Sequence, residues 1–259
     1  MLACALVAEL ILAAAVLARP SAPPQEVAAG RTVRVVNLGG SGAGPLLDRV
    51  SAEIPSAVDA VQAFWGMDWP REIVVVATGS QHQFEAQAGG GPSSQWADIA
   101  AVAVADRVDP GRVAVGQRIV FAPGAAAMSD SALRIVLRHE LFHYAARADT
   151  ALDAPRWLTE GVADFVARPP TAAAPALPTA LPSDADLDTP GPARSLAYDR
   201  AWSFAHFVAG SYGAATLRAF YVAACGPGHA DLPTAVHDVL GADPAGLVAR
   251  WRRWLSPTG

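Results

Sequence analysis

The side chains with the clearest chemical potential lie in the stretch His139-Glu140-Leu141-Phe142-His143. Its two imidazoles are four residues apart, and residues at that spacing project from nearly the same face of an α-helix. Both rings can therefore reach one metal ion. Glu140 lies about 100° round the helix from His139, so its carboxylate can approach the same place without binding the ion. The spacing predicts half of a zinc site with a proton acceptor beside it.

The flanking residues predict a helix from about Met128 to about Arg147 around this pair. Ser129, Asp130 and Ser131 offer N-cap oxygens ahead of an apolar run. The helix is apolar enough to be a buried element, so two histidines on it need polar partners. A metal ion is one such partner, and backbone carbonyls that hold two core histidines are the alternative.

A second segment, from Asp153 to Phe165, provides a third ligand. It also predicts a helix, with Asp153 as its N-cap, and Glu160 lies on it seventeen residues after His143. Catalytic zinc usually takes three protein ligands and keeps a fourth position for water, and two histidines with one glutamate form a known set. The sequence therefore predicts a zinc ion (Zn2+) held by His139, His143 and Glu160.

Asp164 lies four residues after Glu160, on the same face of that helix. From there its carboxylate can accept the far ring N–H of a zinc-bound histidine, which fixes the tautomer and raises the basicity of the ligand. We expect this partner to be His139. The alternative is that Glu160 and Asp164 form a solvated acidic face, but the rest of the helix is largely apolar.

Three segments together resemble the gluzincin metallopeptidases, and in particular the peptidase MA-like domains. They are His139-Glu140-x-x-His143, then Pro155-Arg156-Trp157-Leu158-x-Glu160-Gly161-x-Ala163-Asp164, and later Tyr198-x-x-Ala201-x-Ser203-Phe204. The resemblance covers about Ile119 to Ala224 and leaves out the N-terminal third. It implies an α+β fold, in which a small mixed or antiparallel sheet lobe with the zincin-type active-site helix precedes a mainly helical C-terminal lobe.

The resemblance also implies a role for each matching residue. It gives zinc to the two histidines and Glu160, general-base and general-acid work to Glu140, and support of a ligand to Asp164. It further implies that an edge strand holds a polypeptide substrate by backbone hydrogen bonds.

A tetrahedral intermediate also needs a hydrogen-bond donor opposite the metal. Tyr198 and His206, on the helix expected from Leu196 to Ser211, are the candidates. Related domains commonly have a tyrosine at the position of Tyr198, so the resemblance favours it. The alternatives are an interface tyrosine for Tyr198 and a surface or core histidine for His206.

These groups are those that peptide hydrolysis requires. A zinc ion with an open position lowers the pKa of a bound water and polarises a carbonyl, while a carboxylate such as that of Glu140 takes the water proton and later delivers it to the leaving amine. The sequence thus predicts a zinc-dependent peptidase. The alternative is a catalytically inactive, secreted or membrane-tethered domain that uses the fold for binding or scaffolding, although a scaffold needs no general base beside a metal.

Residues 1–24 predict a signal peptide or an N-terminal membrane anchor. Leu2 to Ala18 is apolar apart from Glu9, and Arg19-Pro20 follow. The run departs from the usual pattern in two ways, because no Lys or Arg precedes it and because a carboxylate inside it is costly. We expect an extracytoplasmic protein, either secreted or anchored to the membrane by this segment.

The remaining chain predicts one domain, residues 30–256, with a sheet-rich lobe over 30–125 and a helical lobe over 128–256. Strands are expected at Arg31–Asn37, Glu72–Thr78, Asp98–Asp106 and Arg112–Pro123. The last two would pair antiparallel, with Arg118–Ala122 as the outer strand beside the cleft. Residues 169–192, rich in proline and alanine, predict a flexible loop that gates the cleft or lies inert on the surface.

The composition limits the partners of this domain. The formal net charge is −5 and no cluster of Lys and Arg is present along most of the chain, which argues against a nucleic-acid partner. Only Arg250, Arg252 and Arg253 gather positive charge, on a predicted helix whose apolar residues form a docking stripe.

Overall fold

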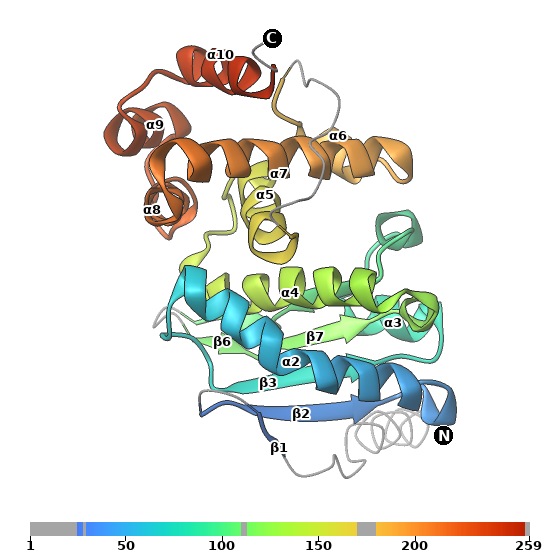
Figure 1. The fold of residues 1–259 in the computed structure, drawn as a ribbon. Helices are drawn as coiled ribbons and strands as arrows, with labels where there is room; N and C mark the ends of the chain where they lie inside the picture. The colour runs from blue at the N-terminus through green and yellow to red at the C-terminus, as the bar shows by residue number, and fades with distance from the viewer. Residues whose placement is uncertain (1–24, 28–29, 110–112, 170–179, 257–259) are drawn as a thin grey trace, which may run out of the picture.

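The computed structural model describes residues 25–27, 30–109, 113–169 and 180–256. It shows an α+β fold, with a small mixed sheet and its covering helices on one side and a mainly helical C-terminal part on the other (Figure 1). This is the fold class that the sequence predicts. The helix that carries the paired histidines runs between the two parts.

Within the described residues, five strands form the main sheet, in the order β1-β2-β3-β7-β4. The strands are β1 Gln25–Glu26, β2 Thr32–Asn37, β3 Glu72–Ala77, β4 Ala101–Val104, β5 Arg107–Val108, β6 Ala114–Val115 and β7 Arg118–Phe121. β2, β3 and β7 are parallel, whereas β1 and β4 run antiparallel to their neighbours at the two edges. β5 and β6 pair separately as a short antiparallel ribbon.

Helices surround this sheet and build the C-terminal part. They are α2 Gly44–Trp65, α3 Gln81–Gln87, α4 Asp130–Ala146, α5 Arg156–Ala167, α6 Asp184–Asp188, α7 Pro192–Tyr212, α8 Ala214–Cys225, α9 Leu232–Leu240 and α10 Pro244–Leu255. The last helix docks through Leu247 and Trp251, which are buried, and Arg252 and Arg253 are exposed as expected; Trp254, another apolar residue of this helix, is 41% exposed.

The N-terminal caps of the two helices that carry the candidate ligands differ from one another. The hydroxyl of Ser129 accepts the backbone N–H of Ala132 and caps α4, as the sequence predicts. Asp153 does not cap α5, so that prediction is wrong. Pro155 occupies the N-cap position, and the Asp153 carboxylate instead lies 3.4 Å from Nε2 of His229.

Alternation of side chains gives the sheet two buried faces. Ile73 and Val75 of β3 and Ile119 of β7 face the main core, on the side that α2 and α4 cover. Val76 and Val120 face a smaller cluster on the other side, which α3 closes with Phe84. The central strands are therefore covered on both faces, as parallel strands generally are.

The strand at the sheet edge beside α4 is β4, and the prediction that Arg118–Ala122 forms this edge is wrong. β7 pairs with β3 on one side and with β4 on the other. Ile119, Val120 and Phe121 of β7 are each fully buried, and such an uninterrupted apolar run is typical of an interior strand. The antiparallel pairing of these two strands agrees with the prediction.

The proline-rich segment 169–192 is not a loop throughout. Residues 170–179 lie outside the described residues, but α6 forms in the part that follows. A capping box begins α6, in which Ser183 accepts the N–H of Asp186 and the Asp186 carboxylate accepts the N–H of Ser183. Arg194 of α7 then holds α6 by donating to the carbonyl of Leu187 at 3.0 Å.

The predicted signal peptide or membrane anchor, residues 1–24, also lies outside the described residues. Among the helices of the described part, none has both the length and the hydropathy that crossing a membrane requires.

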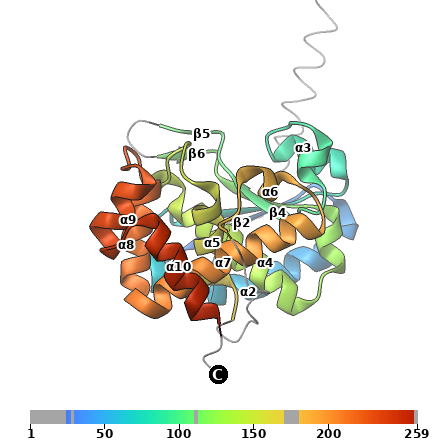
Figure 2. The same cartoon turned by 90° about the horizontal axis from the view of Figure 1, so that it is seen from above.

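α5 packs between α4 and α7, as the two views of the fold show (Figures 1 and 2). The close approach depends on Gly161, because a Cβ atom there would lie 2.5 Å from the carbonyl oxygen of Ala201 in α7. Gly161 follows Glu160 directly, so the contact that brings two helices together also fixes the height of that carboxylate above α4.

Replacing Gly161 with alanine should push α5 away from α7 and lower the free energy of unfolding by about 1–3 kcal/mol, the usual effect of overpacking a core. Thermal unfolding should therefore give a lower Tm for Gly161→Ala than for the wild type. Gly124→Ala is the matched control, since a Cβ there meets nothing within 4 Å. Equal Tm values for the two variants would contradict the role of this helix contact.

Candidate metal centre

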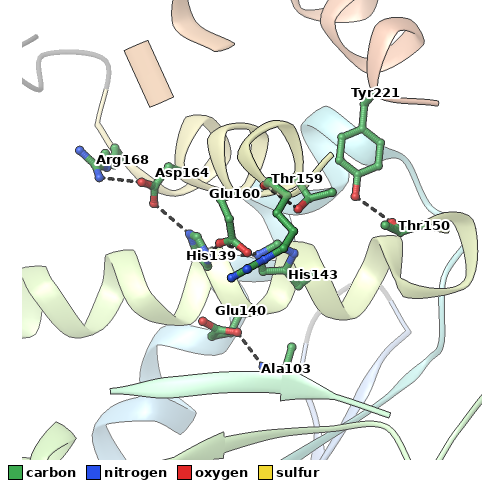
Figure 3. A network of polar contacts seen from close by, with 11 residues as sticks. Ala103, His139, Glu140, His143, Thr150, Thr159, Glu160, Asp164, Arg168 and Tyr221 are labelled. Carbon is green, nitrogen blue, oxygen red and sulfur yellow. Dashed lines mark hydrogen bonds and ion pairs between the residues drawn. The ribbon is translucent and has the colours of Figure 1, made fainter. Parts of the chain in front are cut away.

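α4 and α5 bring the three predicted ligands together. His139 and His143 rise from α4, and Glu160 descends from α5 to meet them (Figure 3). Nε2 of His139 lies 3.1 Å from Nε2 of His143 and 3.1 Å from Oε2 of Glu160, and the third side of the triangle, from His143 to Glu160, is 3.4 Å. The chain thus places one atom of each residue around a common point.

The size of this triangle fits a zinc ion. Two ligand atoms that are each about 2.0–2.1 Å from a tetrahedral ion lie roughly 3.3–3.4 Å apart, close to the three separations in the structure. Two imidazoles and one carboxylate are also donors that zinc accepts, and three such ligands leave a fourth position for water or substrate. The residues present therefore fit the ion that the sequence predicts, and the same three form the metal-type cluster found within the described residues.

The ring orientation of His139 gives independent support. Its Nδ1 lies 2.9 Å from Oδ1 of Asp164, so a proton on Nδ1 is donated to that carboxylate. In the neutral ring Nε2 then carries a lone pair, which is aimed at an oxygen of Glu160. Two acceptors at 3.1 Å repel one another unless a cation lies between them. A metal ion or a proton must therefore occupy this place.

Asp164 is itself held by a buried ion pair. It is 4% exposed, and its second oxygen accepts a hydrogen bond of 2.6 Å from Arg168, one helical turn further along α5. Arg168 also donates to Asp199 of α7 at 2.6 Å. Hydrogen bonds thus link four side chains in series, His139, Asp164, Arg168 and Asp199. Because Asp199 belongs to α7, that helix helps to orient a histidine on α4. The predicted contact of Asp164 with His139 is present.

The surroundings of the triangle shift the pKa values of His139 and Glu160 in opposite directions. Burial opposes a charge on His139, but hydrogen bonds to Asp164 and Glu160 outweigh it and raise the pKa of His139 well above its ordinary value. Burial likewise opposes a charge on Glu160, but the two imidazoles outweigh it and hold the pKa of Glu160 well below its ordinary value. Without a metal, the cluster therefore binds a proton tightly.

Glu140 points from α4 in the opposite direction, toward the sheet (Figure 3). Its Oε2 accepts the backbone N–H of Ala103 in β4 at 2.6 Å. Burial raises the pKa of Glu140 from its ordinary value, although the charges of the two histidines act against this change. The carboxylate lines the same cavity as the three ligands without belonging to their triangle.

Tyr198 and His206 occupy different surroundings, although both lie on α7. The Tyr198 ring is 6.0 Å from the His139 ring, centroid to centroid, and it lines the cavity at the cluster. Burial and the nearby carboxylates, first that of Glu160, raise the pKa of Tyr198 well above its ordinary value. His206 instead stacks on Trp202 at 5.4 Å and is not among the residues that line this cavity.

A cavity of about 370 Å³ opens on the cluster, between the edge of β4 and α4. Two further hollows adjoin it along β4. One lies beside residues 98–101, which lead into β4, and beside α4, and the other lies beside residues 103–106 and Arg147. The first of these shares Ala101 and Tyr198 with the cavity and the second shares Ala103 and Arg147 with it, so the three hollows are called the groove from here on.

Sequence reasoning missed two residues of this groove. Ala103, whose N–H holds Glu140, was hidden because no side-chain chemistry marks it and because β4 was not recognised as the edge. Arg147 lines the cavity one turn beyond His143. Its spacing of four from the second histidine was a signal that could have identified it.

No protein-family model matches this chain, and no curated protein matches it significantly. Its chemistry is therefore inferred from the geometry of the cluster and the groove.

Asp164→Asn should weaken zinc binding by about 10- to 100-fold, the usual effect of losing an outer carboxylate from a ligating histidine. The amide oxygen can still accept the Nδ1–H of His139, but the amide NH2 cannot accept from Arg168, which keeps its bond to Asp199. The imidazole should become a weaker base, and the Tm of the variant is measured to show that it folds. Competition with a chromogenic zinc chelator measures the change. Asp199→Asn is the control, because Asp199 contacts Arg168 but not His139, and it should lower the zinc affinity less. Equal zinc affinities of Asp164→Asn and the wild type would rule out the orienting role of Asp164.

The pH dependence of stability should differ between the metal-free and zinc-loaded protein. The raised pKa of His139 stabilises the metal-free fold below about pH 6.5, and this contribution is lost as the pH rises through the folded-state value. The lowered pKa of Glu160 stabilises the fold above about pH 4.5 and is lost only in stronger acid. The Tm in the presence of EDTA should therefore fall from pH 6 to pH 9, whereas the gain in Tm on adding zinc should grow, because the ligands must be deprotonated. A metal-free Tm that rises steadily over this range would contradict the prediction.

Proposed function

We propose that this protein is a zinc-dependent peptidase. The observation that carries the proposal is the convergence of His139, His143 and Glu160 on one point, with the carboxylate of Glu140 beside them in the same cavity. Zinc bound by the three ligands would supply a water of lowered pKa and would polarise the carbonyl of a peptide bond. A metal site that served only to stabilise the fold would have no use for an open position and a neighbouring carboxylate.

Glu140 is the proton carrier in this proposal. It accepts a proton from the attacking water and returns it to the nitrogen of the leaving amine. Burial, which raises the pKa of Glu140, supports the role, since a carboxyl group closer to neutrality both accepts and releases a proton more readily than an ordinary surface carboxylate.

The edge of β4 is the surface that would hold the substrate. Ala122 donates its backbone N–H to the carbonyl of Ala100, so these residues form a hydrogen-bonded pair of the antiparallel ladder. Because such pairs alternate, the backbone groups of Ala101 and Ala103 point away from β7, toward the groove. An extended polypeptide can pair with these groups largely irrespective of its side chains.

Tyr198 would donate a hydrogen bond to the oxygen that becomes negative during attack on the carbonyl. Its position beside His139 supports this, as does its raised pKa, which keeps the hydroxyl protonated in neutral solution.

A second candidate function is a catalytically inactive zinc domain that binds polypeptides. One observation favours it: Glu140 already accepts the N–H of Ala103 at 2.6 Å, so this carboxylate also has a structural role in joining α4 to the sheet. The peptidase remains our proposal because a neutral side chain such as glutamine would make the same bond.

Glu140→Gln separates the two functions. Its amide oxygen can accept the Ala103 N–H, so the variant should fold and bind one zinc ion like the wild type, yet hydrolysis of casein or a peptide library should fall by about 10²- to 10⁴-fold. Zinc content and Tm are measured on the same samples. The matched control is Glu53→Gln, because Glu53 pairs with Arg134 on the far side of α4. Unchanged hydrolysis by Glu140→Gln, or none by the zinc-loaded wild type, would refute the peptidase.

A further inference from the structure

Arg147 continues the row of ligands on α4. It follows His139 by eight residues and His143 by four, and its backbone keeps right-handed helical angles at the end of the helix. Residues at this spacing share a face, and each helical turn advances about 5.4 Å along the axis. The guanidinium is therefore carried on the same side as the metal cluster, one turn along the groove.

Arg147 lies where two of the hollows along β4 meet. It lines the cavity at the metal cluster and also the adjoining hollow beside Val104 and Asp106. Its side chain is only half-buried. An extended chain that follows β4 past the cluster must pass it.

The charge of Arg147 has no counter-ion in the described part of the chain, where no carboxylate lies within ion-pair distance of it. The other arginines of the groove are satisfied. Arg156 pairs with Asp188 at 2.9 Å, and Arg118 pairs with Asp106 at 2.7 Å. Arg194 is buried and donates to backbone carbonyls, including that of Leu187. Arg168, which lines the hollow at the start of β4, pairs with Asp164 and Asp199. Among these five arginines of the groove, Arg147 is thus the one whose charge is left to bind a ligand.

A guanidinium strongly favours a carboxylate, which it binds through two parallel hydrogen bonds. Residues of an extended chain advance about 3.3 Å each, so one helical turn from His143 corresponds to one or two residues of substrate. We propose, resting on the peptidase function above, that Arg147 selects polypeptides with a carboxylate one to three residues from the bond that is cut. The carboxylate belongs either to an Asp or Glu side chain or to a free C-terminus.

Quenched fluorescent peptides test this selection. Each set places Glu, Gln or Lys at one position within three residues of the cleaved bond, and a parallel set compares a free C-terminal acid with its amide. The wild type should prefer the acidic peptide at one position by about tenfold or more in kcat/KM, the effect of a charge-assisted hydrogen bond. The set that shows the preference identifies the source of the carboxylate.

Variants assign the preference to one residue. Arg147→Gln should remove the discrimination between Glu and Gln while still cleaving the Gln peptide, and Arg147→Glu should shift the preference to Lys. Arg156→Gln is the matched control, because this arginine lines the same cavity but is already paired. A preference that survives in Arg147→Gln, or that disappears in Arg156→Gln instead, would overturn the assignment.

Binding provides a readout that does not depend on turnover. Fluorescence anisotropy of labelled Glu and Gln peptides is measured with the zinc-loaded Glu140→Gln protein and with the same protein carrying Arg147→Gln. Tighter binding of the Glu peptide only when Arg147 is present supports the inference, even if no peptide is hydrolysed and the peptidase proposal fails. Hydrolysis with equal binding of the two peptides would refute the inference and leave the peptidase standing.

Discussion

The main constraint on this structure is that three electron-rich atoms lie at about van der Waals distance from one another. The Nε2 atoms of His139 and His143 and an oxygen of Glu160 stand 3.1–3.4 Å apart, an arrangement that is repulsive unless a cation is shared among them. This arrangement depends on the close packing of α5 against α7 at Gly161. Helix packing thus sets the geometry of the cluster, and a cation bound there would in turn stabilise the packing.

Both parts of the fold support this cluster, each by one buried carboxylate. Asp164 connects His139 through Arg168 to α7, so the helical part fixes the orientation of the ring. Glu140 connects α4 to β4, so the sheet part fixes the position of the carboxylate that we propose as proton acceptor. A change in how the two parts pack would therefore alter ligand geometry and acid–base geometry together.

Local spacing in the sequence was enough to predict the cluster. The four-residue intervals on α4 and α5 place His139 beside His143 and Glu160 beside Asp164, because one helical turn is the same wherever the helix lies. Strands near β2 and β3 were also predicted from their apolar residues, but their parallel pairing with one another and with β7 was not. What failed depended on tertiary neighbours: which of two paired strands is the outer one, whether Asp153 or Pro155 begins α5, and whether α6 forms within a proline-rich segment. Tyr198 and His206 differ in the same way, since both lie on α7 and only packing decides which one faces the cavity.

The hydrogen bond between Glu140 and Ala103 makes one carboxylate serve two competing demands. A peptide that adds to β4 as a full strand needs the amide hydrogen of Ala103, which Glu140 occupies in the empty groove. Docking of the chain and release of this side chain are then a single exchange of acceptors. In the proposed peptidase, the strand would therefore act as a latch that holds the carboxylate of Glu140 until a main-chain carbonyl of the substrate displaces it.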